Sequence, residues 1–275
     1  MTPGPVAWVA RCPDCALERS RLDDPAANGP IVAGWSESAV DAHSRLRRAN
    51  AGRSLDAMAR FAPPPGRRLL DVGCGAGWFL DIARERGLET FGIEPDPGVA
   101  EAARANGHDV TAGLFPRPDA PARSADIVSF NDVLAHLPDP LSALCEAHRL
   151  LAPGGTLILT LPDRRGAFYR MAGALLGLGL KGPYERLWQR GYESPHLWYF
   201  SPGSLEACVR AAGFEPLRHA GLPSVALAGL WGRLAIRGDL GWPARAGLFA
   251  TLAAAHPVIR YGAPSDIMLL LSRKR

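Results

Sequence analysis

The sequence predicts an α/β fold in which helices cover both faces of a doubly wound, mostly parallel, seven-stranded sheet. From Arg68 onward, short apolar segments alternate with amphipathic ones, which is the pattern of βαβ units. A glycine-rich turn follows the first apolar segment, where doubly wound folds hold ligands. The composition, 47% hydrophobic and 21% charged residues, is typical of a folded globular chain.

The predicted strands are short apolar segments bounded by turn residues, and five of them lie in the middle of the chain. We expect strands at Leu69–Gly73, Thr90–Glu94, His108–Ala112, Asp126–Asn131, Thr156–Leu161, Phe214–His219 and Asp266–Ser272.

Segments with helical periodicity lie before, between and after these strands. Ser201 and Pro202 suit the N-cap and the first position of the last helix. We expect helices at residues 36–61, Trp78–Arg86, Gly98–Asn106, Leu141–Leu151 and Pro202–Ala212. The apolar stripe expected on the fourth of them contains Leu141, Leu144, Cys145, His148 and Leu151.

The pattern divides the chain into four parts. Residues 1–61 form an N-terminal extension with a Cys-Pro-Asp-Cys element and a helix, and three prolines, Pro63–Pro65, follow it. Residues 62–221 form the core, 222–264 an apolar helical insertion, and 265–275 the last strand of the core. The N-terminus has no secretory pattern and the five cysteines have no scaffold-like spacing, so we expect a cytoplasmic protein.

The turn after the first predicted strand runs from Asp71 to Gly77, with the sequence DVGCGAG. Glycine allows a tight turn and close approach of a ligand, and the helix that follows offers free N–H groups. Dinucleotide-binding loops have the spacing G-x-G-x-x-G, whereas here the third glycine comes one residue early. Asp71 would repel a pyrophosphate and attract the ammonium group of S-adenosylmethionine (SAM). The loop therefore favours SAM over NAD.

The second predicted strand ends at Glu94. A carboxylate at this position is placed to accept hydrogen bonds from both ribose hydroxyls of the cofactor. Asp96 fits the start of the next helix better than a ligand contact, because the helix dipole favours an acidic residue there.

Residues 68–162 resemble the core of class I SAM-dependent methyltransferases of the small-molecule type, which have a Rossmann-like fold. The resemblance rests on the D-x-G-C-G-x-G loop, the acidic end of the second strand, the segment 132–140 (D-V-L-x-H-L-x-D-P) and the turn 151–157 (L-x-P-G-G-x-L). It implies SAM as cofactor and in-line methyl transfer to a small-molecule, saccharide or lipid-like acceptor. The alternative is a SAM-binding protein with weak or no catalysis.

The resemblance also implies which residues hold the cofactor. The glycine loop would line the methionine part, Glu94 the ribose, and Leu114 or Phe115 the face of the adenine. The polar contact that the family usually makes to adenine has no counterpart in Gly113–Pro116. The implied cofactor-binding residues are Asp71, Gly73, Cys74, Gly75, Gly77, Glu94, Pro95, Leu114, Asn131 and Asp132.

Two histidines are candidate catalytic residues. His136 follows the fourth strand, at the ligand-binding edge of the sheet, and imidazole titrates near neutrality. Relatives often have glutamate before this histidine, where this chain has Ala135, so a structural role in the cofactor pocket is the other interpretation. His196 precedes Trp198 and Tyr199 in a segment similar to one that relatives often have, and these two aromatic residues are candidate substrate contacts.

Cys12 and Cys15 have the spacing of a zinc knuckle, and some related methyltransferases carry an N-terminal zinc ribbon. A structural zinc site needs about four ligands. No second Cys-x-x-Cys pair is present, and His43 adds one ligand at most. We expect a remnant of a ribbon and no bound metal.

The C-terminal part of the sequence is basic and contains two apolar segments. Residues 1–163 have a net charge of −5 and residues 164–275 one of +9. The segments Met171–Leu180 and Leu222–Ile236 fall short of the ~20 apolar residues that span a membrane. They predict a lid over the acceptor; the alternative is a lid that touches a membrane surface or admits a lipid-linked acceptor. The dispersed basic residues do not indicate nucleic-acid binding.

Overall fold

The computed structural model describes residues 1–24, 37–61, 68–117, 122–225, 227, 230–234 and 241–275. These residues form two compact units. Unit 1 contains Met1–Asn50, Asp163–Tyr199 and Gly221–Ile267, and unit 2 contains Ala51–Pro162, Phe200–Ala220 and Met268–Arg275. Pro63–Pro65, the side chain of His43 and part of the predicted insertion (226, 228–229 and 235–240) lie outside the described residues.

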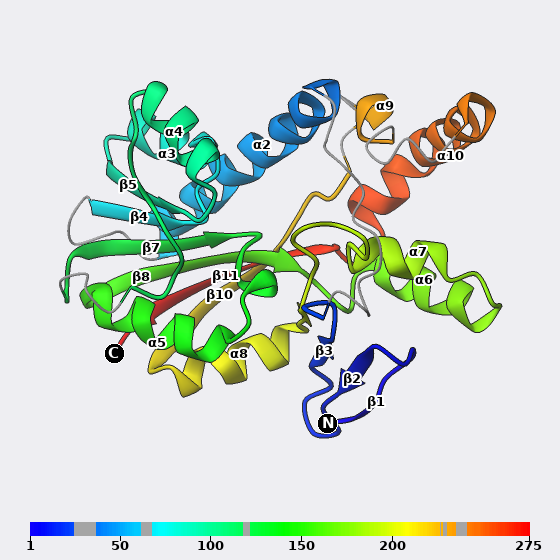
Figure 1. The fold of residues 1–275 in the computed structure, drawn as a ribbon, viewed down its shortest axis with the longest axis horizontal. Helices are drawn as coiled ribbons and strands as arrows, with labels where there is room; N and C mark the ends of the chain where they lie inside the picture. Colours follow the sequence, from blue (N-terminus) through cyan, green and yellow to red (C-terminus); the bar gives the residue numbers. More distant parts are fainter. Residues whose placement is uncertain (25–36, 62–67, 118–121, 226, 228–229, 235–240) are drawn as a thin grey trace. The chain divides into compact units, whose positions relative to one another are not determined.

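Unit 2 is built on a seven-stranded sheet (Figure 1). The strand order is β10 (Phe214–Leu222), β11 (Ile267–Lys274), β8 (Leu151–Pro162), β7 (Ala125–Asn131), β4 (Arg68–Val72), β5 (Glu89–Glu94) and β6 (Asp109–Ala112). The pairs β8–β7, β7–β4, β4–β5 and β5–β6 are parallel. The predicted fold class is confirmed, and each predicted strand overlaps an observed one.

Helices cover both faces of this sheet, as predicted. In Figure 1, α3 and α4 lie on one face and α5 and α8 on the other. Asp96, Asp139 and Ser201 each cap a helix by accepting a backbone N–H, and a proline follows each of them. The helix bounds are Glu37–Phe61 for α2, Trp78–Glu85 for α3, Pro97–Ala105 for α4, Pro140–Leu150 for α5 and Pro202–Ala211 for α8.

The buried face of α5 differs from the predicted stripe. Leu144 is buried as expected, but Leu141 is 42% exposed and Cys145 is exposed. Two alanines take part in the buried face, and their small side chains allow close packing. The prediction is thus right for Leu144 and Leu151, which are both fully buried, and wrong for Leu141 and Cys145. The buried face contains Ala143, Leu144, Ala147 and Leu150.

Unit 1 contains a small antiparallel sheet that was not predicted from the sequence. Strand β3 pairs with β2 and, through Arg19 and Trp198, with β9 from much later in the chain. Strands of two or three residues are too short for alternation to reveal them. The order is β1 (Thr2–Pro3), β2 (Val9–Arg11), β3 (Glu18–Ser20) and β9 (Trp198–Tyr199).

Four helices belong to unit 1 in addition to the first part of α2. Their bounds are Ala167–Gly177 for α6, Gly182–Leu187 for α7, Leu230–Arg233 for α9 and Trp242–Tyr261 for α10. Apolar side chains on these helices and their flanks are exposed, among them Leu178 at 78% and Trp242 at 73%. Among the helices described, none combines the length and the apolar character needed to cross a membrane.

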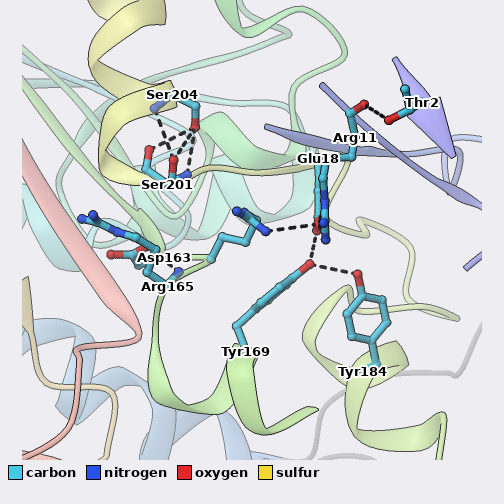
Figure 2. Close-up of polar contacts among 10 residues, drawn as sticks. Thr2, Arg11, Glu18, Asp163, Arg165, Tyr169, Tyr184, Ser201 and Ser204 are labelled. Atoms are coloured by element: carbon cyan, nitrogen blue, oxygen red, sulfur yellow. Dashed lines mark hydrogen bonds and ion pairs between the residues drawn. The ribbon is translucent and has the colours of Figure 1, made fainter. Parts of the chain in front are cut away.

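A buried carboxylate, Glu18, joins the small sheet to the helices of unit 1 (Figure 2). It is fully buried and lies 2.5 Å from Arg11 and 3.5 Å from Arg164. The hydroxyl of Tyr169 donates a hydrogen bond to Glu18 and lies 2.9 Å from the hydroxyl of Tyr184. Burial and the charge of Glu18 raise the pKa of Tyr169, so this hydroxyl stays protonated and able to donate.

Replacement of Glu18 tests whether this network stabilises unit 1. We expect Glu18→Gln to lower the free energy of unfolding by about 1.5–3 kcal/mol, because it removes the charge from the hydrogen bonds that this buried carboxylate accepts from Arg11, Arg164 and Tyr169. Asp23→Asn is the matched control, since Asp23 pairs with Arg19 at the surface, 3.3 Å apart and 43% exposed on both sides. It should cost less than about 1 kcal/mol. Equal losses in urea unfolding would contradict a structural role for Glu18.

Candidate active site

The three glycines of the loop after β4 have positive φ angles, 68° at Gly73, 55° at Gly75 and 93° at Gly77. Glycine enters this region without strain. A Cβ on Gly73 would lie 2.5 Å from Val133, and one on Gly77 would lie 2.3 Å from the ring of His108. A Cβ on Gly75 would meet no described atom within 4 Å. Gly75 is therefore the glycine that leaves room for a ligand.

Asp71, at the carboxyl end of β4, is 2% exposed. Its Oδ1 accepts hydrogen bonds from Ser129 Oγ at 2.7 Å and from Asn131 Nδ2 at 2.9 Å, both on the neighbouring strand β7. Burial raises the pKa of Asp71 to about 7; the two hydrogen bonds oppose this shift and the charge of Glu94 adds to it. A nearby cation would favour the ionised form of this carboxyl group.

Glu94, at the carboxyl end of β5, bridges the glycine loop and the start of α4. Its Oε2 accepts the N–H of Gly75 at 2.9 Å, and its Oε1 accepts the N–H of Asp96 at 3.1 Å. Glu94 is 9% exposed. A carboxylate offers about four lone-pair sites, so two backbone donors leave it able to accept further hydrogen bonds.

His136 ends the short 3-10 turn η1 (Leu134–His136) after β7. Val133, directly before this turn, packs against Gly73, so η1 lies beside the glycine loop. Asp132 has a φ of 58°, and its N–H donates to Thr160 O at 2.9 Å on β8. The strand ends thus bring Asp71, Asp132 and His136 to one edge of the sheet.

His108 supports the loop, a role that was not predicted from the sequence. Its buried ring fills the space beneath Gly77. Arg84 Nη2 lies 2.8 Å from Nδ1 of His108, and Asp81 Oδ1 lies 3.1 Å from Nε2. Because arginine only donates, Nδ1 must accept and the proton lies on Nε2, facing the carboxylate. The spacing of Asp81 and Arg84 on one face of α3 was the only available signal.

The sequence matches the profile of a family described as methyltransferase domain over residues 43–219, which is more than half of the chain. The chain belongs to the methyltransferase family. This match includes the whole segment 68–162 that carried the resemblance, and it confirms a class I SAM-dependent methyltransferase with SAM as the cofactor.

Similar proteins agree with this assignment. The methyltransferase is 28% identical over 172 residues to a ubiquinone biosynthesis O-methyltransferase of Hahella chejuensis, covering 58% of this chain and 68% of that protein. It is 32% identical over 158 residues to one of Alkalilimnicola ehrlichii, covering 54% of this chain and 60% of that protein. These matches thus span about two thirds of the length of the relatives.

A solved structure of a SAM-dependent methyltransferase from Thermotoga maritima has the same fold. It superposes with a TM-score of 0.55 at 20% sequence identity, covering 84% of this chain and 91% of that one.

The strand ends of the methyltransferase fit SAM. The cofactor has a cationic amino-acid end and two ribose hydroxyls, and the site offers Asp71 for the former and Glu94 for the latter. Gly75 lies between these two residues in the sequence, and no described side chain occupies the space where its Cβ would be. A buried carboxyl whose ionised form a cation favours, and a second carboxylate that can accept further hydrogen bonds, fit these two parts of SAM chemically.

Other residues of the predicted cofactor set differ in their surroundings. The thiol of Cys74 is buried against Gly92, and burial raises its pKa to about 12, so it stays protonated. Pro95 is exposed, and Leu114 is 78% exposed, while Phe115 is buried with its ring 5.5 Å from that of Phe130. Leu114 rather than Phe115 therefore remains available to a ligand.

The remaining predicted residues lie in unit 1. His196 is 6% exposed; its Nδ1 lies 2.8 Å from Leu187 O, its Nε2 lies 3.4 Å from Gln189, and its carbonyl accepts a hydrogen bond from Ser20 Oγ. A ring held this way is typical of a structural histidine. Tyr199 is 4% exposed, whereas Trp198 is partly exposed.

Substitution of Gly75 tests the assignment of the ligand space. We expect Gly75→Ala to weaken SAM binding about 5- to 100-fold, because the added methyl group occupies the open space. Gly154→Ala is the control: Gly154 also has positive φ, 73°, with no described atom within 4 Å of its Cβ. Both should lose about 1–2 kcal/mol of stability, but calorimetry should find SAM affinity unchanged in Gly154→Ala. Equal affinities in the two variants would rule the assignment out.

Proposed function

We propose that this methyltransferase transfers the methyl group of SAM to a hydroxyl oxygen of a small acceptor with an apolar part. The observation that carries the proposal is the pair of buried carboxylates, Asp71 and Glu94, at the carboxyl ends of the neighbouring parallel strands β4 and β5 that the glycine loop follows. Oxygen as the acceptor atom is supported by the two relatives, both named O-methyltransferases.

SAM, when bound, supplies an electrophilic methyl carbon and a neutral thioether as leaving group. In the proposal, Asp71 holds the amino-acid end, Glu94 accepts the ribose hydroxyls, and Asn131, Asp132 and the loop fix the methionine part. His136 takes the proton of the acceptor hydroxyl. Its place beside the glycine loop supports this role, as does the partly exposed setting of its side chain.

The acceptor is proposed to be partly apolar because the two relatives are named for the biosynthesis of ubiquinone, a lipid-like quinone. Trp198, being partly exposed, is the better of the two aromatic candidates for an acceptor contact.

The test is release of S-adenosylhomocysteine with hydroxyl compounds, phenolic and aliphatic, each with and without an alkyl chain. We expect turnover with a hydroxyl acceptor, greater with the alkylated form.

Glu94→Gln should weaken SAM binding about 10- to 100-fold through loss of charge-assisted hydrogen bonds. Glu89→Gln, on the same strand but exposed, should bind SAM as the wild type does.

Three outcomes separate the alternatives. SAM binding without any product would favour a SAM-binding protein without catalysis. Turnover only with amines would show that nitrogen rather than oxygen receives the methyl group. A thermal shift with NAD and none with SAM would refute the proposal as a whole.

The raised pKa of Asp71 predicts a pH dependence of SAM binding. The unfolded chain releases this proton near pH 4, whereas the folded protein keeps it up to about pH 7. Stability of the free protein should therefore fall as pH rises from 4 through 7. The ammonium of SAM favours the ionised form, so its affinity should rise over the same range and be about tenfold weaker at pH 6 than at pH 8. Calorimetry on Asp71→Asn should find both dependences reduced; an unchanged profile would exclude Asp71 as their source.

A further inference from the structure

Cys12 and Cys15 lie in the turn that joins β2 and β3 of unit 1. The pairing of Arg11 with Glu18 closes the turn at its base. Within it, the N–H of Cys12 donates to Leu17 O at 2.8 Å, and the N–H of Ala16 donates to Cys12 O at 3.0 Å. Both cysteines are partly exposed. The turn therefore holds two accessible thiols three residues apart.

The turn brings the two cysteines together, because the N–H of Ala16, just after Cys15, donates to Cys12 O. The backbone N–H groups of Cys15 and Asp14 and the thiol of Cys15 lower the pKa of Cys12, while burial raises the pKa of Cys15. Such a pair combines a thiol that ionises more readily with a protonated thiol that can attack next.

The surroundings of the pair do not favour a metal. Among the residues that the structure describes, no group of three or more His, Cys, Asp or Glu side chains is arranged to hold a metal ion. The other cysteines differ from the pair, since Cys74 is buried in the glycine loop and Cys145 and Cys208 lie on the separate helices α5 and α8. The turn is thus the place in the chain where two cysteines meet.

We propose that Cys12 and Cys15 form a modification site that small disulfides convert reversibly into an intramolecular disulfide. The thiolate of Cys12 attacks one sulfur of the small disulfide, forming a mixed disulfide and releasing one thiolate, which takes up a proton. Cys15 then loses its proton and attacks the Cys12 sulfur, and the second small thiol leaves. Two protein thiols lose two hydrogens, and one small disulfide becomes two thiols. The reaction is independent of methyl transfer.

Glutathione disulfide and mass spectrometry test the site. Trypsin cleaves after Arg11 and Arg19, so one peptide, 12–19, holds both cysteines and no other. In the wild type we expect this peptide to lose the mass of two hydrogens without gaining glutathione, and dithiothreitol should restore it. In Cys15→Ser it should instead gain one glutathione on Cys12.

Cys145 provides the internal control because it is exposed but stands on a helix. In Cys15→Ser, Cys12 should react about threefold or more faster than Cys145 at pH 7, because more of it is thiolate. Two glutathiones on wild-type peptide 12–19, or no reaction there while Cys145 reacts, would overturn the proposal. Stoichiometric zinc that protects both thiols in the purified protein would overturn it as well.

Discussion

Two carboxylates at the ends of neighbouring parallel strands impose the main constraint on the site. Both Asp71 and Glu94 are buried, and hydrogen-bond donors point at each of them. Ser129 and Asn131 reach across from β7 to one carboxylate, and the backbone of the glycine loop reaches the other. These hydrogen bonds join β4 to β7 and β5 to the glycine loop, so the geometry of the site depends on contacts that also hold the strand ends together.

Much of unit 2 was predictable because its information is local. Strand length, glycine spacing and the caps at Asp96 and Ser201 depend on neighbours in sequence, and these predictions were confirmed. The supporting contacts were not predictable. His108 beneath Gly77 and Ser129 against Asp71 join residues far apart in the chain, and nothing near them in sequence indicates the partner. Two positions on α5, Leu141 and Cys145, were misassigned because two alanines, Ala143 and Ala147, take part in its buried face beside the leucines.

The roles of His136 and His196 could not be told apart from the sequence. His136 and His196 both precede or follow segments similar to those of relatives, and both are able to carry a proton. Their rings differ in what surrounds them. His196 is buried with a carbonyl at Nδ1, whereas His136 ends a partly exposed turn beside the loop. A role for a histidine follows from the partners of its two nitrogens, which only the folded chain reveals.

Unit 1 is built from three separate segments of the chain, so its parts are synthesised at different times. Glu18 is synthesised 146 residues before Arg164 and 151 before Tyr169. Its carboxylate therefore stays solvated until these hydrogen-bond donors have been made. Strand β3 cannot pair with β9 until β9 has been synthesised. Asp71 meets Ser129 and Asn131 after only about 60 residues. The nascent chain can therefore pair β4 to β8 of its central sheet before β9 completes the N-terminal one, although β1 to β3 are made first and β10 and β11 last.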